Sequence, residues 1–114
     1  MDIKELGPLR IGGFNFAIEC DNHFLEVAQL LGHCATDEGI LRVKDTGPKQ
    51  VVAETLLHES LHAIVDVYLE GLEDRVSEHV VAMISQGLFQ VLQDSPDFAF
   101  YIAGGFEEVE VETG

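Results

Sequence analysis

Basic residues are scarce in this chain of 114 residues, and their scarcity limits its partners. Six lysines and arginines stand against 21 aspartates and glutamates, which gives a formal net charge of -15. A surface of this sign repels phosphate backbones. We therefore expect no binding of nucleic acid.

Cysteines and long apolar runs are also few. Cys20 and Cys34 are too few for a secreted disulfide scaffold, so a reduced, cytoplasmic protein is expected. No apolar run approaches the roughly 20 residues that span a bilayer, and the first five residues do not resemble a signal peptide. The length predicts one domain over residues 1–106, followed by an acidic, mobile tail over residues 107–114.

The first half of the chain carries the pattern of a small sheet. Apolar and other residues alternate before Cys20, as in a strand with one buried face. Apolar and basic residues mix from Ile40 to Lys44, which is typical of an edge strand. The expected elements are strands over residues 9–20, 30–35 and 40–44, a loop or irregular turn over 24–31, and a hairpin turn over 36–39.

The second half predicts two long helices. The first runs from Pro48 to Tyr68 or Leu69, and its two apolar lines place it between the sheet and the second helix. The second runs from Glu73-Asp74 to Leu92. Its expected core face consists of Val76, Val80, Met83, Ile84, Gly87, Leu88 and Val91. Residues 98–102 fit either a last strand or a packing segment, and the whole pattern predicts an α+β fold.

The first long helix contains the motif His58-Glu59-Ser60-Leu61-His62. Residues four apart share one face of a helix, so His58 and His62 can bind one metal ion. Glu59 then lies beside the metal, where it can take a proton from a metal-bound water. The motif therefore predicts a zinc site with Glu59 as general base.

A catalytic zinc needs a third protein ligand. A ligand from the second helix is geometrically easier than Asp66, which continues down the same helix. Stepping by three and four from Glu78 follows a mostly apolar line, whereas the line from His79 turns polar, so Glu78 is preferred and His79 stays the alternative. The other candidates are Glu70, Glu73, Asp74, His23 and His33.

The motif and its surroundings resemble a known family. Residues 54–64, Ser77-Glu78 and residues 87–92 are similar to the small zincin-like metallopeptidases encoded in bacteriophage genomes. They are more distantly similar to bacterial peptidases that cleave repressors. The similarity covers residues 10–95, and it implies a cytoplasmic location in a bacterium or a phage-infected host cell.

This resemblance implies a minimal zincin-like domain, with a small, mostly antiparallel sheet packed on two long helices. It implies a gluzincin-like site, in which His58, His62 and Glu78 bind Zn²⁺ and Glu59 is the general base. It also implies that a peptide or protein substrate adds to the edge strand from Ile40 to Lys44. Arg42, Lys44 and Lys49 would then receive acidic substrate groups, unless their charges only prevent edge-to-edge aggregation.

One departure from the family concerns the oxyanion. Larger peptidases of this class supply a Tyr or His from a separate subdomain to stabilise it. This chain offers only His79, Tyr68, Tyr101 and His23, and the spacing places none of them. The alternative function is therefore a weakly active or inactive zincin-shaped module that binds metal and a partner. The sequence leaves the oligomeric state open.

Overall fold

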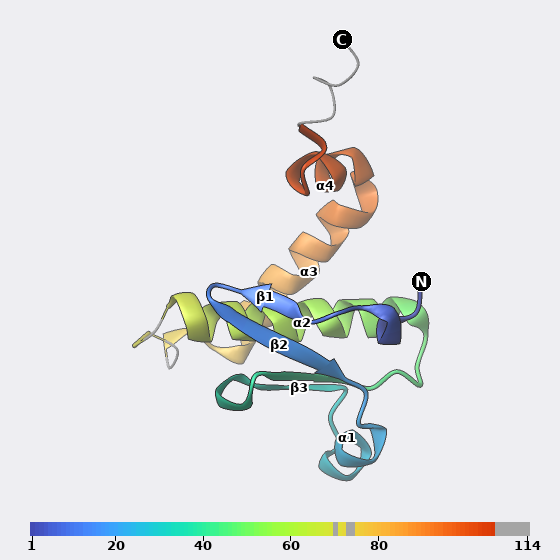
Figure 1. Ribbon diagram of the computed structural model, residues 1–114, viewed down its shortest axis with the longest axis vertical. Coiled ribbons are helices and arrows are strands. Elements are labelled where there is room, and N and C mark those ends of the chain that lie inside the picture. Colours follow the sequence, from blue (N-terminus) through green and yellow to red (C-terminus); the bar gives the residue numbers. More distant parts are fainter. Residues whose placement is uncertain (70, 73–74, 107–114) are drawn as a thin grey trace.

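The computed structural model describes residues 1–69, 71–72 and 75–106 (Figure 1). The proposed tail over residues 107–114 lies outside this part of the chain, as do the candidate ligands Glu70, Glu73 and Asp74. The elements are η1 (Ile3–Glu5), β1 (Leu9–Ile11), β2 (Phe14–Glu19), α1 (Asn22–Ala28), β3 (Gly32–Ala35), η2 (Thr36–Glu38), β4 (Ile40–Val43), α2 (Lys49–Tyr68), α3 (Glu78–Asp94) and α4 (Pro96–Ile102).

The four strands form one mixed sheet in the order β1-β2-β4-β3. The pairs β1–β2 and β3–β4 are antiparallel, and the pair β2–β4 is parallel. The prediction of an α+β fold with a mostly antiparallel sheet is confirmed. Gly39 is the last residue of the predicted turn. Its φ is 68°, which the hairpin between β3 and β4 requires and which glycine adopts at little cost.

The prediction that Ile40 to Lys44 form an edge strand is wrong. Strand β4 pairs on both sides, and the edge on this side is β3. Leu41 and Val43 are fully buried, whereas Arg42 points to the other face and contacts the ring of Phe24 at 4.9 Å. The mixture of apolar and basic residues therefore reflects the two faces of an interior strand, not an exposed edge.

Two local predictions in the first half also need correction. The single strand expected over residues 9–20 is a hairpin, because Gly12 reverses the chain at φ 61°. The loop expected over residues 24–31 contains helix α1. The carboxylate of Asp21 accepts a hydrogen bond from the backbone N–H of Phe24 at 3.0 Å and caps this helix. Leu25, within α1, is fully buried.

Helix α2 lies between the sheet and helix α3, as the two apolar lines predicted. It begins after Pro48, which stands at the N-cap, and it ends at Tyr68. Its Ala63 joins the main core cluster with Ile11, Phe16 and Leu41 from the sheet. The core therefore fixes the rotation of α2 and hence the direction in which its histidines point.

Helix α3 differs from its prediction in both start and face. It begins at Glu78, where the hydroxyl of Ser77 accepts a hydrogen bond from the N–H of Val80 at 3.2 Å. Its buried residues are Val81 and Ser85. The expected core positions Val80, Met83 and Ile84 are instead 41 %, 47 % and 54 % exposed. The line of residues that starts at Glu78 therefore faces α2.

The C-terminal part of α3 extends beyond the rest of the domain and carries α4 at its end (Figure 1). Residues 98–102, left open between a strand and a packing segment, belong to α4. The molecule measures 56 × 34 × 25 Å along its principal axes. Within the described residues, no helix is both long enough and apolar enough to cross a membrane.

Candidate metal centre

His58 and His62 lie one turn apart on the same side of α2. Their Nε2 atoms are 3.2 Å apart, and their rings meet edge to face with centroids 4.9 Å apart. The i, i+4 spacing of the motif places them this way because successive turns of a helix stack its side chains. Both side chains are about a quarter exposed, so an ion can reach them from solvent.

Glu78 reaches these two histidines from the first turn of α3. Its Oε1 atom lies 2.7 Å from Nε2 of His58, and its Oε2 atom lies 2.7 Å from Nε2 of His62. Each of the three side chains offers one potential ligand atom, and these three atoms lie within 4.8 Å of one another. The carboxylate is 70 % exposed, so the mostly apolar line that starts at Glu78 does not bury it. Its position at a helix N-terminus favours its negative charge.

The other described candidates lie elsewhere. The Oδ2 atom of Asp66 accepts a hydrogen bond from the hydroxyl of Thr36 at 2.5 Å. His33 lies on strand β3 beside Arg42 and Phe24. His79 is exposed on α3 and His23 is exposed on α1. Among the described residues, the group of potential metal ligands contains only His58, His62 and Glu78.

Glu59 is buried between α2 and the sheet, with 8 % of its surface exposed. Burial raises the pKa of Glu59 from 4.5 to about 7, because desolvation disfavours its charged form. The nearby His58 acts in the opposite direction, and the carboxylate of Glu78 raises the pKa further. A carboxyl group with a pKa near neutrality is suited to accept and return a proton.

Gly32, the first residue of β3, covers the side chain of Glu59. A Cβ atom at this position would lie 2.7 Å from Cγ2 of Thr55, 2.8 Å from Oε2 of Glu59 and 2.9 Å from its Cγ. Only a residue without a side chain lets the strand approach the helix this closely. The backbone of Gly32 therefore shields the carboxyl group of Glu59 from solvent.

A cleft of about 370 Å³ adjoins this centre on the side of β3. It contains His58, Glu59 and Glu78 together with groups that the sequence did not single out. The remaining lining residues are Gln29, Leu30, Leu31, Gly32, Val51, Glu54 and Thr55. Of these residues, only Glu54 could have been placed near the site from the sequence, since it precedes His58 by one helical turn on the same face. The segment over residues 29–32 reaches the cleft through the tertiary fold.

The expected acceptors of acidic substrate groups do not line this cleft. Arg42 forms ion pairs with Glu19 and Glu38 at 3.9 and 3.6 Å, and Lys44 pairs with Glu26 at 3.7 Å. Lys49 lines a different cavity. The cleft therefore lends no support to the prediction that these three residues receive an acidic substrate, and it stays a prediction. Their charges are paired within the chain or lie away from the centre.

The four residues considered for oxyanion stabilisation are also outside the cleft. Tyr68 is 64 % exposed near Gly12 at the end of α2, and the ring of Tyr101 packs against Phe106. His79 and His23 are exposed on their helices. Two side chains that do line the cleft can donate a hydrogen bond, the amide of Gln29 and the hydroxyl of Thr55.

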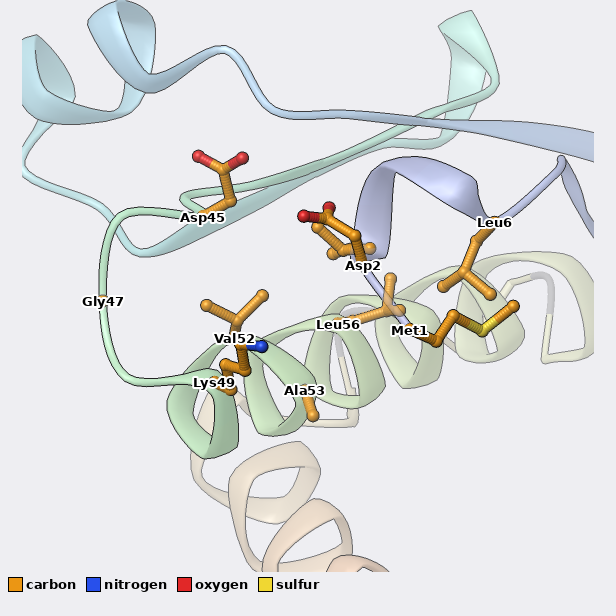
Figure 2. A pocket seen from close by; sticks show the side chains of 10 residues that line it. Met1, Asp2, Leu6, Asp45, Gly47, Lys49, Val52, Ala53 and Leu56 are labelled. Carbon is orange, nitrogen blue, oxygen red and sulfur yellow. The ribbon is translucent and has the colours of Figure 1, made fainter.

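A second cavity, of about 220 Å³, lies on another face of α2 (Figure 2). Its walls are Val52, Ala53 and Leu56 of the helix and the N-terminal segment from Met1 to Leu6. Three charged side chains line it, Asp2, Asp45 and Lys49, and Asp45 is already held by Asn22 and Lys4. This cavity contains no set of potential metal ligands, so the candidate site is the cleft beside His58.

Comparison with known proteins adds no relative. The chain matches no protein-family model, no curated protein and no solved structure. The functional argument therefore depends on the geometry of the centre itself.

Proposed function

We propose that this chain is a zinc-dependent metallopeptidase of the minimal zincin type, located in the cytoplasm. The observation that carries this proposal is the convergence of His58, His62 and Glu78 on one point, next to the buried Glu59. Two thiols that form no disulfide, Cys20 and Cys34, suit a reducing compartment.

The three side chains fit a tetrahedral zinc ion. Imidazole nitrogens bind zinc at about 2.0–2.1 Å, so two of them in a tetrahedral site lie about 3.3 Å apart. The observed separation of the two Nε2 atoms is 3.2 Å. The carboxylate of Glu78 lies closer, at 2.7 Å from each nitrogen, which is a hydrogen-bond distance. Because Glu78 is largely exposed, it can withdraw by the few tenths of an ångström that a bound ion requires.

Bound zinc supplies Lewis acidity, which polarises a carbonyl group and lowers the pKa of a coordinated water to about 7. The chain supplies the remaining functions. His58 and His62 would hold the ion through Nε2, and Glu78 would complete a set of three protein ligands. Glu59 accepts the proton of the attacking water and returns it to the leaving amine.

The outer edge of β3 offers the backbone groups that would hold a peptide. The N–H of Lys44 donates to the carbonyl of Leu31 at 2.8 Å, and the register pairs Gly32 with Val43. Since inward and outward groups alternate along an antiparallel strand, the N–H and C=O groups of Gly32 and Cys34 point away from β4. A substrate strand that pairs with them would pass beside Glu59. We accordingly move the expected substrate edge from β4 to β3.

Metal analysis and peptide cleavage test this function together. Purified wild-type protein should hold close to one zinc per chain, whereas His58→Ala, His62→Ala and Glu78→Ala should each lose most of it. Glu59→Gln should retain the metal and lose hydrolysis of a peptide library. A wild-type protein that stays metal-free in a buffer with zinc would refute the proposal, and so would hydrolysis that survives Glu59→Gln.

The alternative function is a metal-binding interaction module without useful catalysis. The feature that favours it is the origin of Glu78 on α3, because a metal held by α2 and α3 would also fasten the two helices together. A structural metal of this kind would make chelation unfold the domain. A catalytic metal would leave most of the fold intact.

A further inference from the structure

The cleft beside the metal centre carries a charge pattern that bears on the substrate. Three glutamates line it, and no lysine or arginine is among the described residues that do so. Glu78 approaches the two histidines, and Glu59 is covered by Gly32. The third carboxylate, Glu54, has neither task.

Glu54 is a half-buried carboxylate that has no partner in the part of the chain that the structure describes. Among the described residues, no hydrogen bond and no ion pair reaches it. It stands one helical turn before His58, about 6 Å away along the helix axis. A group bound at Glu54 would thus belong to a substrate residue close to the bond that faces His58.

The walls around Glu54 are apolar. Val51, Leu30 and Leu31 line the same cleft and are 41 %, 42 % and 57 % exposed. Apolar side chains that leave this much surface in a cleft favour a long aliphatic chain from a ligand. The carboxylate beside them favours a positive charge at the end of that chain. Lysine and arginine combine an aliphatic stem with a cationic head.

We infer that Glu54 is a specificity-determining residue, which selects a substrate peptide with a lysine or arginine next to the scissile bond. The aliphatic stem of that residue packs against Val51, Leu30 and Leu31, and its cationic head pairs with Glu54. The net charge of -15 assists by attracting basic peptides to the surface. This inference rests on the proposed peptidase function and adds a substrate class to it.

The test uses blocked hexapeptides of alanine and leucine that carry one lysine, norleucine or glutamate at each position in turn. Zinc-loaded wild type should cleave the lysine peptide at one position about five to ten times more efficiently than its norleucine counterpart, judged by kcat/KM. In Glu54→Gln, the ratio should fall close to one. Asp97→Asn removes the same charge from α4, far from the cleft, and should keep the wild-type ratio. Added salt should lower the ratio because it screens a half-exposed pair.

Binding separates this inference from the proposed function. Zinc-loaded Glu59→Gln should bind the fluorescent lysine peptide more tightly than the norleucine peptide, and adding Glu54→Gln should remove the difference. If the wild type cleaves none of the peptides but this binding preference holds, the peptidase proposal fails and the role of Glu54 stands. Equal cleavage and binding of lysine and norleucine peptides would overturn the inference alone, as would a preference that persists in Glu54→Gln.

Discussion

At the scale of single residues, Gly32 has little room for change. We expect Gly32→Ala to push β3 away from Glu59 and Thr55, to cost about 1–3 kcal/mol of unfolding free energy and to lower peptide hydrolysis. Adding Thr55→Ser removes the Cγ2 atom that meets the new methyl group and should restore part of both losses. Denaturant unfolding and kcat measurements check this prediction.

A second glycine provides a matched control. Gly87 lies within α3, and a Cβ atom there would meet nothing within 4 Å. Gly87→Ala should therefore stabilise the protein by about 0.5–1 kcal/mol, because alanine has the higher helix propensity. If Gly32→Ala were also neutral or stabilising, the close approach of β3 to Glu59 would not be a constraint.

Glu59 predicts a pH dependence of the metal-free protein. Its folded pKa of about 7 lies above the ordinary value of 4.5, so the folded state favours the protonated carboxyl group. The stabilising contribution is complete below pH 4.5 and disappears as the pH rises through 7. Above pH 7, metal-free Glu59→Gln should be more stable than metal-free wild type by about 2–3 kcal/mol, with little difference at pH 4.

Thermal unfolding after chelation measures this difference. Glu5→Gln, a substitution on the exposed η1 segment, should show no such rise between pH 4 and pH 8. A constant difference between wild type and Glu59→Gln across this range would contradict the burial of a proton-binding carboxyl group at position 59.

At the scale of elements, the capping residues in the sequence are better guides to the helices than the count of apolar residues. Asp21 three residues before Phe24, and Ser77 three residues before Val80, are helix caps that mark the starts of α1 and α3. Counting apolar residues instead favoured the wrong face of α3. Its richer line contains Met83 and Ile84, but packing against α2 buries the line of Val81 and Ser85.

The sequence could likewise predict some features of the candidate metal centre but not others. The spacing of His58 and His62 is a property of one helix, so the motif predicts their proximity without knowledge of the fold. Glu78 could be chosen by its periodicity. The contact of Gly32 with Glu59 depends on how β3 lies across α2, and no local pattern carries that information.

The N-terminal 3₁₀ turn η1 is held by Asp45. Asn22 donates a hydrogen bond to Asp45 at 2.8 Å, and Lys4 lies 3.4 Å from its other oxygen. The hydrogen bond from Asn22 is the main cause that lowers the pKa of Asp45 below its ordinary value of 3.8, and Lys4 lowers it further. This contribution to stability is therefore present above that value and is lost as the pH falls through the lowered pKa.

Asp45→Asn should accordingly loosen η1 at neutral pH, because Lys4 loses its anionic partner. Methyl chemical shifts of Ile3 and Leu6 in NMR spectra would report this change. Wild type should approach the same spectrum only below about pH 4. Asp37→Asn, on the exposed turn η2, serves as control and should leave these shifts in place.

At the scale of the whole molecule, the core does not depend on the candidate metal centre. The fully buried side chains of Phe16, Leu25, Leu41 and Val43 belong to the sheet and to α1. We therefore expect chelation to leave the circular dichroism spectrum largely unchanged and to lower the melting temperature moderately. Amide exchange should increase mainly near Glu78, where α3 loses its link to α2. Cooperative unfolding on chelation would instead indicate a structural metal.

The projection formed by the end of α3 and by α4 also determines how the protein moves through water. The radius of gyration of the protein is 15.7 Å, compared with about 13 Å for a compact domain of this length. A particle of this shape meets more friction than a sphere of the same mass. A single chain of 12.5 kDa should therefore elute early from a gel-filtration column calibrated with globular standards. Sedimentation equilibrium, which is insensitive to friction, gives the number of chains directly.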